Sequence, residues 1–408
     1  MKIVSPGNAK PQSSIYPTIP TTMNATFTRR NWLKAGAALT AGFTLGGIDT
    51  AKANAAVHSF RRSQLSREAQ IAADMPVLKA RLFANENPWG PSENAKKAII
   101  NALADSYKYP FMEQRHFTAM IAKQEGVSPE HVMVGAGSSE MLLAAALYYS
   151  RKGGNIIAAD PSYDYLMEAA AGYGATWVKV PLNKDYAHDL EAMEKRLNAD
   201  TKLMYVCNPN NPTGTILQTE KLRSFCESVS RKVPVFVDEA YIDYLDDPKK
   251  HSMIEAVRKG QNVIVARTFS KVHGFAGLRI GYLIAPPALV KAFSTYYTDG
   301  MDISAISMQG AMASYQDKAF TEMVVQKTAE SRDFLYQTLK AEGYEYVPSH
   351  ANFVIFPVKM EAKKFSEEMM KRGVGVRNWQ FGGKQWCRVS LGTMDEMQVF
   401  AQAFREIS

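Results

Sequence analysis

The stretch Leu203-Met204-Tyr205-Val206-Cys207-Asn208-Pro209-Asn210-Asn211-Pro212-Thr213-Gly214 joins an apolar run to a rigid turn rich in proline and asparagine. Similar apolar runs recur at residues 155–159, 233–237, 262–266 and 280–284. They are continuous rather than alternating in polarity, which is typical of strands buried on both faces. We therefore expect a mostly parallel sheet that binds ligands at the carboxyl ends of its strands.

Helical stretches separate these runs and complete an α/β pattern. Residues 139–149 follow a glycine-rich turn, and residues 219–230 open on Thr219, a residue type that caps helices. Beyond Pro287 the pattern changes. It predicts a long helix over about 307–342, then short strands at 352–356, 374–377 and 387–391, and a final helix over about 394–404. The pattern predicts a large domain with a helix-covered sheet and a smaller α+β domain.

The first 55 residues read as a leader. Thr28-Arg29-Arg30-Asn31-Trp32-Leu33-Lys34 precedes a weakly apolar run, and Ala51-Lys52-Ala53-Asn54-Ala55 follows it. The run is shorter than the roughly 20 residues of a membrane span. Basic segment, apolar run and small residues are typical of a signal peptide, and the paired arginines resemble a twin-arginine (Tat) leader. We expect export to the periplasm through the Tat translocase, without a stable membrane anchor; an amphipathic or disordered tail is the alternative.

The net charge and the cysteine content limit which partners and ligands we expect. The 408 residues carry a net charge of +8, and the leader's six Lys and Arg against Asp49 account for five of these charges. No basic stripe remains, so nucleic acid is not an expected partner. Because neither C-x-x-C nor H-E-x-x-H occurs, no metal site is expected. We expect the three scattered cysteines, Cys207, Cys226 and Cys387, to be buried thiols.

Three polar motifs follow predicted strands: the Asn211 turn, Asp238-Glu239-Ala240-Tyr241, and Thr268-Phe269-Ser270-Lys271 with Arg279. A fourth, Gly135-Ala136-Gly137-Ser138-Ser139-Glu140, precedes a predicted helix. An acid at the end of an apolar strand needs a cation or donors, and a partly buried lysine can form a Schiff base. Hydroxyls, arginine and a helix start can hold a phosphate. Glu140 stands where a dinucleotide fingerprint needs glycine. Taken singly, each motif is also compatible with an ordinary turn, cap or surface charge.

The order and spacing of these residues, with Arg388 much later, resemble the site of fold-type I pyridoxal-phosphate (PLP) aminotransferases. Asn85-Glu86-Asn87-Pro88, Tyr107-Lys108-Tyr109-Pro110 and Asp160-Pro161-Ser162-Tyr163 look like the histidinol-phosphate aminotransferase branch of the class I and II enzymes. The resemblance covers residues 81–404. With it we expect a leader (1–55), an arm and part of the small domain (56–107), a large PLP domain (108–300) and a small domain (301–408).

The resemblance implies a role for each site residue. Lys271 would hold PLP as a Schiff base and move the substrate's α-proton, Asp238 would face the pyridine nitrogen, and Asn211 and Tyr241 would bind the ring's phenolic oxygen. Tyr163 would stack on the ring. The phosphate would be bound by Ser138, Ser139, Thr268, Ser270, Arg279 and, from the other subunit of a homodimer, Tyr109. Substrate would be bound by Arg388, Asn87 and Arg377, although Arg377 also fits an exposed strand-end charge.

The implied reaction is a ping-pong transfer of an amino group from an aromatic or histidinol-phosphate-like donor to a 2-oxo acid such as 2-oxoglutarate. A PLP-dependent decarboxylase of the threonine-phosphate type is the main alternative. A non-enzymatic PLP-binding regulator and a dinucleotide oxidoreductase are the others. Export would favour broad or aromatic specificity over histidine biosynthesis. His273, two residues after Lys271, either tunes the site or only packs.

Overall fold

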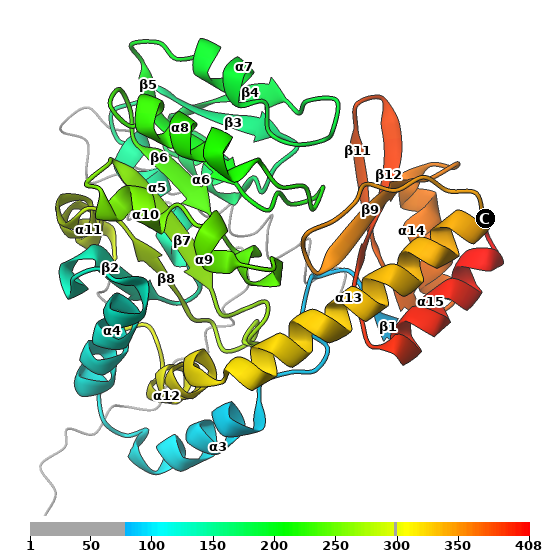
Figure 1. Ribbon diagram of the computed structural model, residues 1–408, viewed down its shortest axis with the longest axis horizontal. Coiled ribbons are helices and arrows are strands. Elements are labelled where there is room, and N and C mark those ends of the chain that lie inside the picture. The colour runs from blue at the N-terminus through cyan, green and yellow to red at the C-terminus, as the bar shows by residue number, and fades with distance from the viewer. Residues whose placement is uncertain (1–77, 298–299) are drawn as a thin grey trace, which may run out of the picture. The chain divides into compact units, whose positions relative to one another are not determined.

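The computed structural model describes residues 78–297 and 300–408, and the predicted leader lies outside these ranges. Its larger sheet has seven strands in the order β2-β8-β7-β6-β5-β3-β4 (Figure 1). They are β2 (Val132–Gly135), β3 (Asn155–Asp160), β4 (Thr176–Pro181), β5 (Thr201–Cys207), β6 (Val235–Asp238), β7 (Val263–Thr268) and β8 (Gly281–Ile284). Strands β3 to β7 pair in parallel, whereas β8 is antiparallel to both β2 and β7. The prediction of a mostly parallel sheet is confirmed.

Alternate residues of the central strands face two separate clusters of buried side chains. Val235 and Val237 of β6 pack in one cluster, and Phe236 packs in the other. In β5, Met204 and Tyr205 divide in the same way. Both faces of the sheet are therefore buried, which explains why its strands read as continuous apolar runs.

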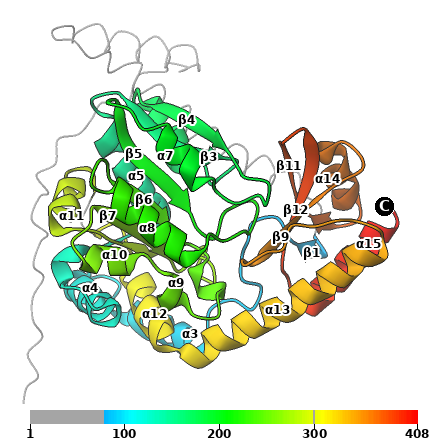
Figure 2. The ribbon, with the colours of Figure 1, turned by 45° about the horizontal axis from the view of Figure 1, so that its top comes forward.

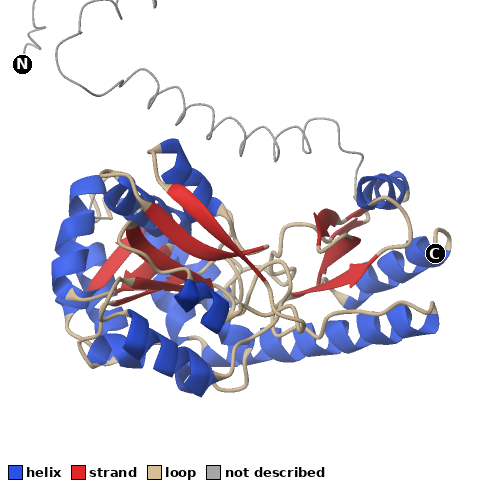
Figure 3. Ribbon diagram, turned by 90° about the horizontal axis from the view of Figure 1, so that it is seen from above, coloured by secondary structure: helices blue, strands red, loops and turns tan. Residues whose placement is uncertain are grey.

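Helices cover both faces of this sheet (Figure 3). The first cluster includes buried residues of α3 (Glu93–Ala102), α4 (Phe111–Glu125), α7 (Leu190–Lys195), α8 (Thr219–Val229), α10 (Ile254–Arg258) and α12 (Ala305–Gln316). The second includes residues of α5 (Ser138–Ser150), α6 (Tyr165–Gly172) and α11 (Pro287–Phe293). The shorter elements are α9 (Pro248–His251), η2 (Leu103–Asp105), η3 (Pro129–His131), η4 (Ile242–Tyr244) and η5 (Ser294–Tyr296).

A second core forms around a smaller antiparallel sheet. This sheet has the order β11-β12-β9, with β9 (Phe353–Pro357), β11 (Arg377–Phe381) and β12 (Lys384–Ser390). A two-stranded parallel pair joins β1 (Ala80–Arg81) to β10 (Val374–Gly375). Helices α13 (Lys318–Ala341), α14 (Ala362–Lys371) and α15 (Met394–Arg405) lie beside this sheet (Figure 2). Their buried side chains complete this core. Because Ala80 and Leu82 pack here too, the segment before α3 contributes to the second core.

Three predictions about these elements were wrong. The stretch 307–342 is not one helix, because Asp317 leaves helical geometry and its side chain caps α13 by accepting from the Phe320 N–H. The strand expected at 374–377 is divided between β10 and β11, which pair with different partners. Thr219 is the first residue of α8 rather than its cap, and its hydroxyl contacts His251 Nδ1 at 2.6 Å.

Helix α12 belongs by packing to the larger core. Met308 and Ala311 lie in the cluster around the seven-stranded sheet, together with Ile303. The change from one core to the other therefore falls near Asp317. None of the helices in 78–297 and 300–408 combines the length and the apolarity needed to cross a membrane.

Candidate active site

The predicted site residues of the larger domain follow neighbouring parallel strands at one edge of the sheet. Cys207, the last residue of β5, pairs in register with Asp238, and Asp238 pairs with Ala266 of β7. The turn carrying Asn211 and the segment carrying Lys271 therefore begin on either side of Asp238. This is the position at which open α/β sheets bind ligands.

Asp238 is a buried carboxylate held by two donors. It is 1% exposed; the hydroxyl of Tyr205 donates to Oδ2 at 3.0 Å and the N–H of Ala240 donates to Oδ1 at 3.1 Å. Burial raises the pKa of Asp238 to about 6, while both hydrogen bonds and the charge of Lys271 oppose the rise. Sequence reasoning missed Tyr205. A tyrosine in a strand buried on both faces was the available signal, because its hydroxyl needs a partner there.

Lys271 directs its amine into the same region. Its Nζ donates to the backbone carbonyl of Asn85 at 3.2 Å and lies 5.4 Å from the centre of the Tyr241 ring. Burial lowers the pKa of Lys271 to about 8, and the positive charge of Arg388 lowers it further. A lysine with a pKa near 8 has a substantial fraction of free amine near neutral pH, as a nucleophile requires.

The start of α5 and the segment after β7 form a cradle of donors. Gly137 precedes the helix with no side-chain cap, and a Cβ on it would lie 2.5 Å from Nη2 of Arg279. A Cβ on Gly281 would lie 2.7 Å from the backbone N of Ser138. Because neither position has a Cβ, Arg279 and β8 can lie directly against the start of α5. Such a helix start, next to a guanidinium, suits an anion.

The hydroxyls of this cradle lie close to the same arginine. Ser270 Oγ accepts from Thr268 Oγ1 at 3.0 Å and from Arg279 Nη1 at 3.4 Å. Arg279 itself has φ 51°, a left-handed conformation that is uncommon for arginine. This backbone directs the side chain back over its own turn, where Nη1 donates to the carbonyl of Ala276 at 2.9 Å.

Arg388 is a buried cation without an acidic partner among the described residues. It is 2% exposed; Nη1 donates to Asn211 Oδ1 at 2.7 Å, Nη2 donates to the carbonyl of Phe83 at 2.8 Å, and Nε has no partner in the described ranges. Burial lowers the pKa of Arg388 to about 9, and the neighbouring charge of Arg377 contributes. An unpaired buried guanidinium is costly, so this group is suited to bind an anion that enters the site.

Arg377 is exposed and lies directly opposite Arg388 on the neighbouring strand β11. Side chains of directly opposed residues share one face of a sheet, so both arginines point to the same side. Arg377 also contacts the ring of Trp379, 5.9 Å from its centre. Two like charges placed opposite each other are unfavourable without an anion between or beside them.

Tyr163, Tyr109 and Asn87 occupy different environments. The ring of Tyr163 is stacked with that of Tyr165 at 6.3 Å, and burial raises its pKa, with Asp238 and Tyr241 contributing. Tyr109 is 75% exposed. Asn87 donates from Nδ2 to the carbonyl of Val272 at 2.8 Å. Asn87 also lines a cavity of about 330 Å³. The expected contact between Asn87 and the substrate stays a prediction.

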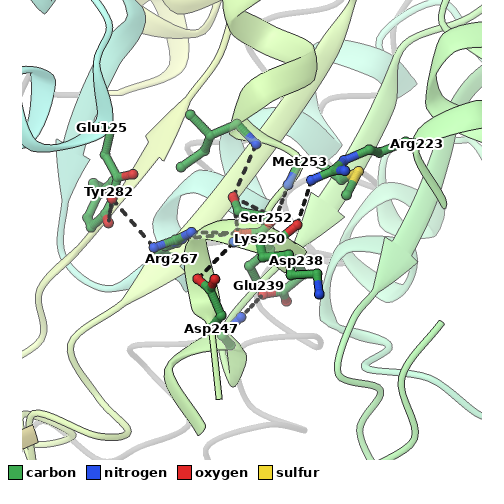
Figure 4. A network of polar contacts seen from close by, with 12 residues as sticks. Glu125, Arg223, Asp238, Glu239, Asp247, Lys250, Ser252, Met253, Arg267 and Tyr282 are labelled. Carbon is green, nitrogen blue, oxygen red and sulfur yellow. Dashed lines mark hydrogen bonds and ion pairs between the residues drawn. The ribbon is translucent and has the colours of Figure 1, made fainter. Parts of the chain in front are cut away.

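A buried ionic network lies directly behind Asp238 (Figure 4). Arg267 Nε donates to Glu239 Oε2 at 3.1 Å, and Arg267 Nη1 lies 3.4 Å from Glu125 Oε1. The hydroxyl of Tyr282 donates to the same Glu125 oxygen at 2.9 Å. Glu239 follows Asp238 and Arg267 precedes Thr268, so this pair connects the ends of β6 and β7. Sequence reasoning did not identify the network, because the two acids lie far apart in the chain.

His273 and the cysteines do not contribute a charge to the site. The ring of His273 lies 4.5 Å from that of Phe269, and Nδ1 is 2.9 Å from Ser314 Oγ. Burial lowers the pKa of His273 to about 3, so the imidazole ring is neutral near pH 7 and packs against Phe269.

Cys207, Cys226 and Cys387 are buried free thiols, as predicted. The described ranges contain no cluster of His, Cys, Asp and Glu that could hold a metal ion.

Comparisons with a family profile and with individual relatives identify the same family. The sequence profile of the family "Aminotransferase class I and II" matches residues 79–404. The chain is 34% identical over 329 residues to a histidinol-phosphate aminotransferase of Moorella thermoacetica, a match that covers 80% of this chain and 85% of the relative. It is 34% identical over 346 residues to the enzyme of that name from Caldicellulosiruptor saccharolyticus, covering 85% and 95%.

A solved structure shares the fold. The histidinol-phosphate aminotransferase from Sinorhizobium meliloti, crystallised in complex with pyridoxal-5'-phosphate, superposes with a TM-score of 0.76 at 25% identity. The superposition covers 95% of this chain and 100% of that one.

Proposed function

This chain belongs to the class I and II aminotransferases, which are PLP-dependent transaminases, and on that premise we propose that Lys271 is the residue that anchors the cofactor. The observation that carries the proposal is the amine of Lys271, whose pKa burial lowers to about 8. The amine lies at the carboxyl edge of the sheet, with Asp238 and Arg388 contributing to its pKa. A free amine in this place can attack a carbonyl and later accept or return a proton.

The residues around Lys271 fit PLP in charge and shape. The cradle of Ser138, Ser139, Thr268, Ser270 and Arg279 offers donors to a phosphate, and Gly137 leaves the space that a Cβ would fill. When bound, PLP supplies an electron-withdrawing ring that stabilises negative charge at the substrate's α-carbon.

Three further side chains would orient that ring. Asp238, kept in place by Tyr205, would face a protonated ring nitrogen and thereby remain ionised. Oδ1 of Asn211 accepts a hydrogen bond from Arg388, so the side-chain N–H groups of Asn211 remain available as donors to the ring's oxygen. Tyr163, which lies close enough to Asp238 and Tyr241 to be influenced by both, would cover one ring face.

Arg388 would bind the anionic group shared by amino donor and 2-oxo acid. Its unpaired Nε and the side chain of Arg377 on the same sheet face offer two positive groups to a substrate. We propose 2-oxoglutarate as acceptor and an aromatic or histidinol-phosphate-like molecule as donor. Support for this donor class comes from the named relatives and from the aromatic rings of Tyr163, Tyr241 and Phe353 near these charges.

A homodimer is part of the proposal. Among the described residues, the large apolar side chains that are at least half exposed concentrate between positions 100 and 112: Ile100, Leu103, Tyr107, Tyr109, Phe111 and Met112. A second copy of the chain would cover this surface and would bring Tyr109 to the neighbouring cofactor phosphate.

We also propose export through the Tat pathway, on the sequence pattern of residues 1–55 alone. In the periplasm the enzyme would be separated from cytoplasmic intermediates. Aromatic amino acids would then be better donors than histidinol phosphate.

A donor screen tests the function. Purified holoenzyme is incubated with 2-oxoglutarate and either phenylalanine, tyrosine, tryptophan or histidinol phosphate, while glutamate, 2-oxo product and CO₂ are measured. We expect glutamate and 2-oxo product in equal amounts, with the highest kcat/KM for an aromatic amino acid. Strict preference for histidinol phosphate would refute the donor order. CO₂ release without glutamate would refute the aminotransferase itself.

A further inference from the structure

The segment Leu82–Asn87, here called the N-terminal strap, crosses the site and is hydrogen-bonded both to β12 and to the segment that carries Lys271. The carbonyl of Leu82 accepts from the N–H of Ser390, the last residue of β12. The carbonyl of Phe83 accepts from Arg388, and Asn87 is bonded to the carbonyl of Val272, next to Lys271. Asn85 lies in the middle of this strap and is 2% exposed.

Every polar atom of Asn85 has a partner. Its N–H donates to Ser390 Oγ at 2.8 Å, and its carbonyl accepts from Lys271 Nζ at 3.2 Å and from Asn352 Nδ2 at 3.0 Å. The side-chain Oδ1 accepts from Ser390 Oγ at 3.0 Å, and Nδ2 donates to the hydroxyl of Tyr241 at 3.0 Å. Its φ of 54° is a left-handed conformation that asparagine tolerates better than most residues.

Ser390 fixes which way the amide of Asn85 faces. Its Oγ already accepts from the Asn85 N–H, so its own proton needs an acceptor. Oδ1 of Asn85 is that acceptor, and Ser390 Oγ makes no hydrogen bond to any other side chain within the described ranges. With Oδ1 held by Ser390, only the NH₂ group of the amide can face Tyr241.

We propose that Asn85 is a positioning residue that aims the hydroxyl proton of Tyr241 into the cofactor site. Because Asn85 donates to the phenolic oxygen, Tyr241 cannot direct its proton at Asn85. No other acceptor for that proton lies within hydrogen-bond distance in the described part of the chain. The proton is thus available to an acceptor near Lys271, which is the ring oxygen of PLP in the proposed function on which this inference rests.

Other groups influence Tyr241 but cannot replace this contact. The titratable and charged side chains that face it are Arg388, Asp238, Cys207, Tyr163, Tyr244 and Lys271. Burial raises the pKa of Tyr241, while the charge of Arg388 and the hydrogen bond from Asn85 oppose the rise. Tyr241 therefore stays a neutral donor at physiological pH, and only Asn85 sets its direction.

A double-mutant cycle tests the inference on holoenzyme. The readout is the pH at which the absorbance of the lysine-bound cofactor changes, together with the Kd of PLP for cofactor-free protein. Asn85→Gly suits the left-handed backbone and removes only the amide. We expect it to raise the transition by about half a pH unit, because the donor to the cofactor is no longer aimed. Asn85→Asp can only accept the Tyr241 proton and adds a negative charge, so we expect about one unit or more.

In the Tyr241→Phe background, Asn85→Gly should give no further shift, because Asn85 acts through the hydroxyl. Ser390→Ala, which frees the amide to turn, should shift the transition in the same direction. The inference is overturned if Asn85→Gly has no effect on folded holoenzyme, or shifts the transition equally with and without the Tyr241 hydroxyl. If Tyr241→Phe alone changes nothing, the proposed role of Tyr241 fails as well.

Discussion

The hydroxyl of Tyr205 donates to Oδ2 of Asp238 across 3.0 Å, between the neighbouring strands β5 and β6. The backbone N–H of Ala240 binds the other carboxylate oxygen. Burial alone would favour the protonated acid, and these two donors favour the ionised one. Tyr205 is thus the side chain that keeps Asp238 both oriented and charged.

Replacing Tyr205 by phenylalanine should therefore weaken the binding of PLP. We expect the pKa of Asp238 to rise further and the Kd for PLP to increase about tenfold at pH 7, with a larger loss at pH 6. Fluorescence titration of cofactor-free protein from pH 5.5 to 8 measures this. Tyr149→Phe is the matched control, because the Tyr149 hydroxyl is buried without a partner in the described structure. Equal Kd values for both variants at every pH would contradict the role of Tyr205.

Asp238 should also make the stability of cofactor-free protein depend on pH. Its pKa in the folded state is about 6, above the value of about 3.9 for an unfolded chain. The folded state binds this proton more tightly, so stability falls as pH rises from about 4 to about 6 and does not recover above that range. Asp238→Asn cannot ionise. Its free energy of unfolding should exceed that of the wild type by roughly 1–3 kcal/mol at pH 7, and this excess should shrink to about 1 kcal/mol or less at pH 4.5.

Urea unfolding of both cofactor-free proteins between pH 4.5 and 7.5 checks this prediction. The difference between the two curves isolates Asp238, since all other groups titrate in both. An Asp238→Asn variant that is less stable than wild type at pH 7 would show that the carboxylate is stabilised without cofactor.

Arg267 and Glu239 form a buried ion pair, so removing either charge alone should leave the other buried and uncompensated. Arg267→Met leaves Glu239 uncompensated, since Glu239 is 1% exposed, and should cost about 3–5 kcal/mol. Combining it with Glu239→Gln should restore part of that loss. Denaturant unfolding of the single and double variants measures the coupling, with the exposed pair Arg231 and Glu227 as control. Additive losses would contradict a coupled pair.

Arg388 should govern substrate affinity much more than cofactor affinity. Arg388→Lys keeps the charge but loses the fork that contacts Asn211, Phe83 and an incoming anion. We expect the KM for 2-oxoglutarate to increase about 100-fold, while the Kd for PLP changes little. Arg377→Lys, at the exposed opposite position, should have a smaller effect. A twofold change or less for Arg388→Lys would exclude it as the main anion-binding residue.

The sequence predicted a mostly parallel large sheet and the motifs after its strands because both are local patterns. Asp238 and Lys271 follow apolar runs that had to be buried strands, so their meeting at one edge follows from parallel pairing. The elements that were wrong depend on single side chains. Asp317 ends one helix and caps the next, and no periodicity signals whether an aspartate inside a helical stretch will do so.

The contacts between distant segments could not be predicted. Tyr205 and Arg267 look like ordinary strand residues in sequence, and the motif that contains Asn85 does not indicate which side chain Asn85 contacts. Each depends on a partner far along the chain: Tyr205 on Asp238, Asn85 on Tyr241 and Arg267 on Glu239. Glu125 lies 142 positions from Arg267. Such pairs depend on tertiary packing, which neither spacing nor composition encodes in a single sequence.

Lys271 should be the residue that carries the cofactor covalently. Holoenzyme is reduced with borohydride to make the lysine–cofactor bond permanent, digested, and mapped by mass spectrometry, with Lys271→Ala and Lys291→Ala treated in parallel. We expect one equivalent of cofactor on the peptide containing Lys271 in wild type and in Lys291→Ala, and none in Lys271→Ala. Cofactor found on a different lysine of wild-type protein, or retained covalently by Lys271→Ala, would contradict it.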